Sequence, residues 1–154
     1  MLKKKFILIL LLFVSSCGYE PIHSKKNSNK YNFSISELTF IGEREINLKI
    51  KEKLNNYTLA EKNKNFILKI SSNKKKTVVS KNTSGDPTSF KSTIVVNIQV
   101  KMKNNFKNNL QLIEDFNYNN IDNKFDLKKY EREIINNLTE TVTDKLIYNL
   151  SNMQ

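Results

Sequence analysis

A ten-residue segment of alternating polarity constrains the fold of this 154-residue chain more than any other feature. One side of the segment carries Ile94, Val96, Ile98, Val100 and Met102, and the other side carries Thr93, Val95, Asn97, Gln99 and Lys101. Such alternation predicts a β-strand with one buried and one solvent-facing side. A one-sided strand favours an antiparallel sheet whose apolar face is covered by other elements.

Three further segments predict strands. The first spans residues 32–40, and the second opens at residues 66–70 and resumes at 77–79 after three lysines. The last covers residues 110–118, where Glu114 interrupts the apolar face. We expect a turn at 104–109, and an eleven-residue polar loop at Ser80–Phe90, which is longer than most hairpin connections.

Two segments predict helices. The first begins at residues 42–45, where acidic side chains suit the positive end of a helix dipole, and ends at Asn55 and Asn56. The second begins at an expected N-cap, Asp126, with Phe125 and Tyr130 as a hydrophobic staple. Its apolar residues recur every four positions, at Tyr130, Ile134, Leu138, Val142, Leu146 and Leu150.

The expected order is strand, helix, strand, strand, strand, helix. The simplest way to bury two amphipathic helices and one sheet face is an α+β, two-layer α/β sandwich with both helices on the same side. We therefore predict a four-stranded mixed sheet in which the first two strands are parallel. The length of residues 32–154 suits a single domain.

The N-terminal segment predicts the cellular compartment. Three lysines precede a nine-residue apolar run, Phe6–Val14, whose helical rise of about 14 Å is too short to span a bilayer. The run leads into Val14-Ser15-Ser16-Cys17, which resembles a bacterial lipobox. We predict a lipoprotein signal peptide at residues 1–16, lipid attachment at Cys17 and a flexible tether at residues 17–31. Two acyl chains would anchor the chain stably.

The charge of the chain favours an anionic partner. The formal net charge is +11, and without the three signal-peptide lysines it is 23 − 15 = +8. Such a balance suits an anionic lipid or an acidic glycolipid. Codon bias in an AT-rich genome is an equally good explanation, because the chain is also crowded with Asn and Ile.

The sequence carries few groups suited to catalysis. One Cys and one His exclude a disulfide framework and a Cys/His zinc site within the chain. No Gly-rich phosphate loop and no hydrolase or metalloprotease motif is present. Glu131 and Glu133, which flank Arg132, and the pair Asp122 and Asp126 are expected to make surface ion pairs. We predict a protein that is not an enzyme and that needs no cofactor and no metal.

Seven lysines are candidate contacts for an anionic ligand: Lys74, Lys75, Lys76, Lys81, Lys91, Lys101 and Lys103. We expect a hairpin to bring them towards one end and edge of the sheet, where mobile point charges suit phosphate groups. Solvation of a loop and protection of an edge strand explain the same lysines equally well. The compartment, and the lack of aromatic residues among these lysines, argue against nucleic acid.

The start of the mature chain allows a comparison with a known family. Cys17-Gly18-Tyr19-Glu20-Pro21-Ile22 resembles the Cys-Gly-aromatic-x-Pro-Leu start of the lipopolysaccharide-assembly lipoproteins of the LptE type. The element order resembles that family across nearly the whole mature chain, although Ile22 replaces the usual Leu. Gly18 lacks the charge of an inner-membrane retention signal, so the resemblance implies the outer membrane.

The resemblance also implies a partner and a role. It implies a partner of the large LptD-type β-barrel translocon, with its domain facing the periplasm and the barrel lumen, which it partly plugs. Delivery of lipopolysaccharide to the outer leaflet would be the function, with basic side chains contacting the lipid. An accessory lipoprotein of another envelope lipid-transport system, or an enzyme or inhibitor of the envelope, remain alternatives.

Overall fold

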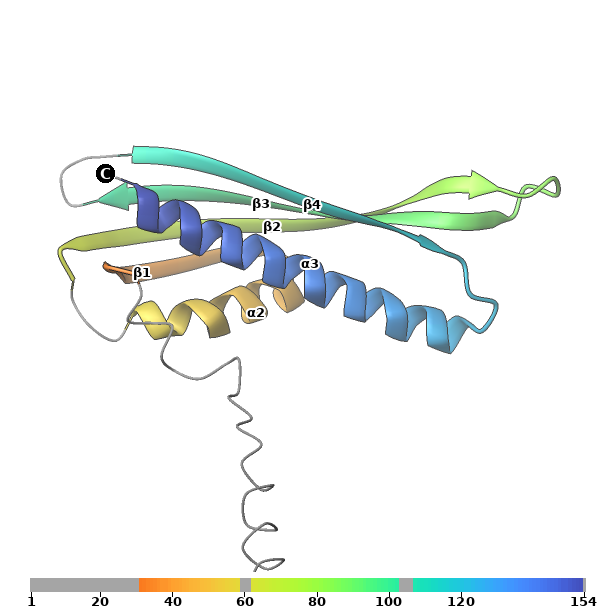
Figure 1. Cartoon of the computed structure of the whole chain (residues 1–154), viewed down its shortest axis with the longest axis horizontal. Helices are drawn as coiled ribbons and strands as arrows, with labels where there is room; N and C mark the ends of the chain where they lie inside the picture. Colours follow the sequence, from red (N-terminus) through yellow and green to blue (C-terminus); the bar gives the residue numbers. More distant parts are fainter. Residues whose placement is uncertain (1–30, 59–61, 103–106, 154) are drawn as a thin grey trace, which may run out of the picture. The chain divides into compact units, whose positions relative to one another are not determined.

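The computed structural model describes residues 31–58, 62–102 and 107–153 (Figure 1). Its elements are β1 (Phe33–Gly42), α2 (Arg44–Leu54), a 3-10 turn η2 (Asn55–Tyr57), β2 (Lys64–Lys81), β3 (Pro87–Met102), β4 (Lys107–Asn119) and α3 (Lys124–Asn152). This order confirms the predicted succession of strands and helices.

The four strands form one mixed sheet in the order β1-β2-β3-β4. β1 and β2 are parallel, whereas β2–β3 and β3–β4 are antiparallel. Figure 1 shows α2 and α3 on the same side of the sheet. The structure therefore confirms the predicted two-layer α+β sandwich.

The core lies between the sheet and the two helices. β2 contributes Phe66, Leu68 and Ile70, all fully buried, and the predicted apolar face of β3 is buried from Ile94 to Val100. α3 contributes two adjacent rows instead of the single predicted row. The second row includes Thr139 and Thr143, whose hydroxyls each donate 2.7 Å hydrogen bonds to the carbonyl four residues earlier. These bonds satisfy the hydroxyls, so the polar row can be buried.

The turn from β1 into α2 requires a glycine. Gly42 has a φ of +97°, and a Cβ at this position would lie 2.0 Å from the carbonyl oxygen of Ser72. This close approach lets the Glu43 amide donate to the same Ser72 carbonyl at 3.2 Å. The Ser72 hydroxyl in turn donates to Asn47 Oδ1 at 2.7 Å. The start of α2 is therefore tied to the middle of β2.

β2 and β3 extend further than the sequence pattern predicted. The three lysines lie within one continuous strand, and residues 80, 81 and 87–90 also pair in the sheet. The expected eleven-residue loop is wrong, because only Asn82–Asp86 connect the strands. Asn82 Oδ1 accepts from the Ser84 and Asp86 amides at 3.0 and 2.8 Å, and this side-chain turn closes the hairpin.

The predicted start of α3 is also corrected. The N-cap is Asn123, whose Oδ1 accepts from the Phe125 amide at 2.9 Å, so Asp126 lies inside the first turn. Phe125 is 71% exposed and cannot form the expected staple. Within β1, the pairing with β2 shifts between Ile35 and Glu37, which accounts for the imperfect alternation of that segment.

The sheet has two unlike halves. In the proximal half all four strands are present, because β1 ends at Gly42 opposite Ser72. The distal half is the part beyond Ser72, where only β2, β3 and β4 continue. Figure 1 shows that the N-terminal part of α3 runs below this distal half, whereas α2 lies by the proximal half.

Candidate functional site

Cys17, the predicted lipid-attachment residue, lies outside the described residues, as do the predicted signal peptide, nearly all of the predicted tether and Lys103. These remain predictions from the sequence. Within the three described ranges, no helix is long and apolar enough to cross a membrane.

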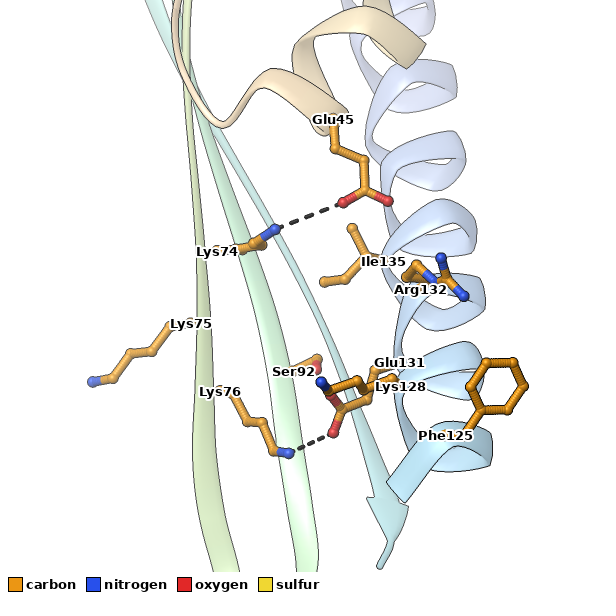
Figure 2. A pocket seen from close by; sticks show the side chains of 10 residues that line it. All are labelled: Glu45, Lys74, Lys75, Lys76, Ser92, Phe125, Lys128, Glu131, Arg132 and Ile135. Atoms are coloured by element: carbon orange, nitrogen blue, oxygen red, sulfur yellow. Dashed lines mark hydrogen bonds and ion pairs between the residues drawn. The ribbon is translucent and has the colours of Figure 1, made fainter. Parts of the chain in front are cut away.

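The structure separates the candidate lysines instead of gathering them. Successive strand residues point to opposite faces, so Lys74 and Lys76 face α3 and Lys75 points away from it, as Figure 2 shows. Lys91 and Lys101 lie on the same outer face as Lys75, ten residues apart along β3, which corresponds to roughly 33 Å. Lys81 pairs with Pro87 beside the hairpin turn.

A cavity of about 570 Å³ lies between the distal half of the sheet and α3. Its charged lining consists of Lys74, Lys75, Lys76, Lys128 and Arg132, with Glu45 and Glu131. Its other lining residues are Ser92, Phe125 and Ile135. Three of the seven candidate lysines therefore line one cavity, although Lys75 lies on its outer side (Figure 2).

Lys74 is neutralised by the start of α2. Its Nζ lies 3.1 Å from Glu43 Oε2 and 3.7 Å from Glu45 Oε2. The two carboxylates compete with an anionic ligand for this ammonium. These pairs are about one-third or more exposed, so water screens them and their contribution to stability is small.

Lys76 is held by a second network, which connects β2, β4 and α3. Its Nζ lies 2.5 Å from Glu131 Oε1 and 3.8 Å from the centre of the Phe90 ring. The Tyr118 hydroxyl donates to the same Glu131 oxygen at 2.9 Å. We call Lys76, Glu131 and Tyr118 the distal clasp, because they join the N-terminal part of α3 to the sheet.

The surroundings of Tyr118 in the distal clasp raise the pKa of its hydroxyl. Burial raises the pKa of Tyr118 to about 12, the Ser92 hydrogen bond lowers it in part, and the Glu131 carboxylate adds to the rise. The hydroxyl therefore stays protonated and donates to Glu131 throughout the neutral range. The expected surface pairing of Glu131 is confirmed, since it pairs with Lys76.

Two cations of the cavity were missed by the sequence reasoning as ligand contacts. Lys128 and Arg132 are exposed on α3, and neither makes an ion pair with an acid of the described ranges. Their four-residue spacing places both on one side of the helix. That spacing, beside the buried Ile135, is the signal by which they could have been found.

The described residues contain no cluster of His, Cys, Asp or Glu side chains that could hold a metal ion. The cavity instead combines cations with aliphatic surface. Such an arrangement suits recognition of an anion that carries an apolar part.

Comparison with known proteins gives the fold a context. No protein-family model matches the chain, and no curated protein matches its sequence. Among solved structures, the rare lipoprotein B of Shewanella oneidensis superposes with a TM-score of 0.58 at 12% identity, over 74% of this chain and 92% of that one. An uncharacterized lipoprotein B of Nitrosomonas europaea has a TM-score of 0.53 at 14% identity, over 87% and 90% of the two chains.

A putative lipoprotein of Caulobacter crescentus is a further structural neighbour. Its TM-score is 0.52 at 10% identity, over 75% of this chain and 88% of that one. The domain therefore has the fold of bacterial lipoproteins that include rare lipoprotein B. At these identities the similarity is one of fold.

Proposed function

We propose that the protein is an outer-membrane lipoprotein that assists lipopolysaccharide transport as the partner and partial plug of an LptD-type β-barrel. The observation that supports this most is the Cys-Gly-Tyr-Glu-Pro segment from Cys17 to Pro21, which precedes a domain with the fold of bacterial lipoproteins. A lipid-anchored sandwich that binds its partner through its surface needs no catalytic group.

The anchor is the first part of the proposal to test. Growth of the native host with labelled palmitate should label the protein, and Cys17→Ser should abolish both the label and its recovery in the outer-membrane fraction. Two acyl chains hold a protein stably at a bilayer, whereas none leaves only its surface charge. A Cys17→Ser protein that still carries label, or an intact leader on the mature protein, would contradict the assignment.

The partner is tested by recovery of the complex from membranes. A tag placed after Gln154, combined with crosslinking, should recover a large outer-membrane β-barrel. Recovery of the components of another lipid-transport system instead would replace this proposal with the alternative of an accessory lipoprotein.

Direct binding of lipopolysaccharide is tested by replacing the three consecutive lysines of β2. Replacing Lys74, Lys75 and Lys76 by Gln should weaken binding, and added salt should weaken it further, because exposed charges are screened. The control variant replaces Lys49, Lys51 and Lys69, which removes the same charge away from the cavity. Equal affinity of the two triple variants would assign Lys74, Lys75 and Lys76 to solubility.

A further inference from the structure

The cavity beside α3 holds cationic groups of two kinds. Lys74 and Lys76 already contact carboxylates of the protein, at 3.1 Å from Glu43 and 2.5 Å from Glu131. Lys128 and Arg132 carry no such partner among the described residues, although both line the same space. Figure 2 shows Lys128 extending from α3 towards the sheet. The cavity therefore has an open cationic position that faces its interior.

We propose that this cavity binds a single-chain carboxylate amphiphile of the long-chain fatty-acid type. Lys128 and Arg132 hold the carboxylate at the rim, and the alkyl chain lies inward along Ile135. The inference is independent of the proposed transport role, because it concerns only the described domain.

The chemistry of the lining supports a carboxylate as the acid group. The neighbouring lysines bind carboxylates in the structure itself, so the site already accommodates this pairing. Lys128 and Arg132 lie one helical turn apart, so their side chains start from neighbouring positions on α3. Figure 2 draws the Lys128 ammonium towards the sheet and the Arg132 guanidinium away from it, so both reach one carboxylate once the exposed Arg132 side chain turns towards the cavity. The guanidinium of Arg132 offers two parallel donors that match the two oxygens of a carboxylate.

The rest of the lining supports an alkyl chain. Ile135 lies in the wall, and the lysine side chains contribute four-carbon aliphatic stems while their ammonium groups remain in water. Phe125 lines the cavity yet is 71% exposed, so its ring offers apolar surface at the opening. A volume of about 570 Å³ lies within the range of small-molecule sites.

The test uses the full-length protein in dodecyl maltoside, with laurate as the probe. Lysines are acetylated with a water-soluble reagent, and each site is quantified by mass spectrometry. Laurate should slow acetylation of Lys128 several-fold and leave Lys129, the next residue on α3, unchanged, because Lys129 does not line the cavity. Dodecanol, which lacks the acid, and acetate, which lacks the chain, should not protect Lys128.

Variants then assign the contacts. Arg132→Gln should raise the laurate concentration that half-protects Lys128 about tenfold, since a charge-assisted hydrogen bond is lost. Arg44→Gln, on α2 and outside the cavity lining, is the matched control and should leave that concentration unchanged. Glu131→Gln should lower it, because a negative charge beside the bound carboxylate is removed.

Three results would overturn the inference. Equal protection of Lys128 and Lys129 would indicate a general effect of charged micelles. Equal protection by dodecanol and laurate would indicate that no carboxylate is recognised. No protection of Lys128 at any laurate concentration, in a protein whose circular dichroism shows it folded, would leave the cavity without this ligand.

Discussion

The two halves of the sheet share β2, β3 and β4 but differ in how their faces are covered. In the proximal half, Phe66, Leu68 and Ile70 are fully buried, and the Phe33 ring stacks on Tyr57 at 4.7 Å. In the distal half, Lys74 and Lys76 occupy α3-facing positions of β2 and line a cavity between the sheet and the helix. The proximal half thus holds most of the apolar core, and the distal half holds the cavity for which we propose a ligand.

The largest expected difference between the halves is in the free energy of unfolding that is lost when a leucine of α3 is replaced by alanine in each half. Leu146→Ala, at a fully buried proximal position, should lower the free energy of unfolding by about 4 kcal/mol. Leu127→Ala, in the first turns of the helix at 6% exposure, should cost about 2 kcal/mol, because water can fill the space left at this end. Urea unfolding followed by circular dichroism measures both, and equal losses would contradict the comparison.

The two glycines with positive φ, one in each half, allow the stability cost of an added Cβ to be compared between the halves. Gly42→Ala should cost about 3 kcal/mol, since it adds a clash with the Ser72 carbonyl to the strain of φ +97°. Gly85, in the distal hairpin turn, has φ +89° but no atom within 4 Å of an added Cβ. Gly85→Ala should therefore cost about 1 kcal/mol from backbone strain alone. Thermal unfolding of the pair would separate the two contributions.

A smaller difference is expected when one hydrogen bond is removed from each half. Ser72→Ala leaves Asn47 Oδ1 without its 2.7 Å donor in a buried site and should cost about 2 kcal/mol. Tyr118→Phe removes one of two donors to Glu131 Oε1, which keeps Lys76, and should cost about 1 kcal/mol. If the tyrosine variant lost more stability than the serine variant, the distal clasp would be the stronger of the two networks.

The smallest effect is a pH dependence to which one tyrosine of each half contributes, because burial raises the pKa of Tyr57 in the proximal half as well as that of Tyr118 in the distal clasp. The pKa of Tyr118 is raised to about 12 in the folded protein, above its ordinary value of 10.0, so the folded state holds this proton more tightly than the unfolded state does. Stability from this group is complete below pH 10 and is lost as the pH rises towards 12. Tyr118→Phe should remove this contribution and leave that of Tyr57, so the loss of stability in that window becomes smaller, as urea midpoints at several pH values would show.

The proximal half could be predicted from the sequence because its side chains alternate or recur with a clear period. The face of β3 from Val96 to Val100 and the α3 residues Val142, Leu146 and Leu150 are buried as expected. The parallel β1–β2 pair also followed from the helix between them. Burial therefore produces the pattern from which these elements can be inferred.

The distal half was harder to infer because its part of β2 carries three consecutive lysines and its hairpin is polar. Residues 80–90 lack an apolar face, so their pairing into a long hairpin left no periodic signal. The alternation of Lys74, Lys75 and Lys76 followed once the strand was known to be continuous. The cavity depends on how closely α3 approaches the sheet, which is a property of tertiary packing and not of local sequence.

The strand order β1-β2-β3-β4 has a consequence for how the chain folds as it is made. Each strand pairs with the strand before it in the chain, so the sheet can form from the N-terminal to the C-terminal strand without waiting for distant segments. α3, the helix that covers most of the apolar face of the sheet, is the last element of the chain, at residues 124–152. Until α3 packs, the sheet exposes that face, and a chain that ended before residue 124 would be prone to aggregate.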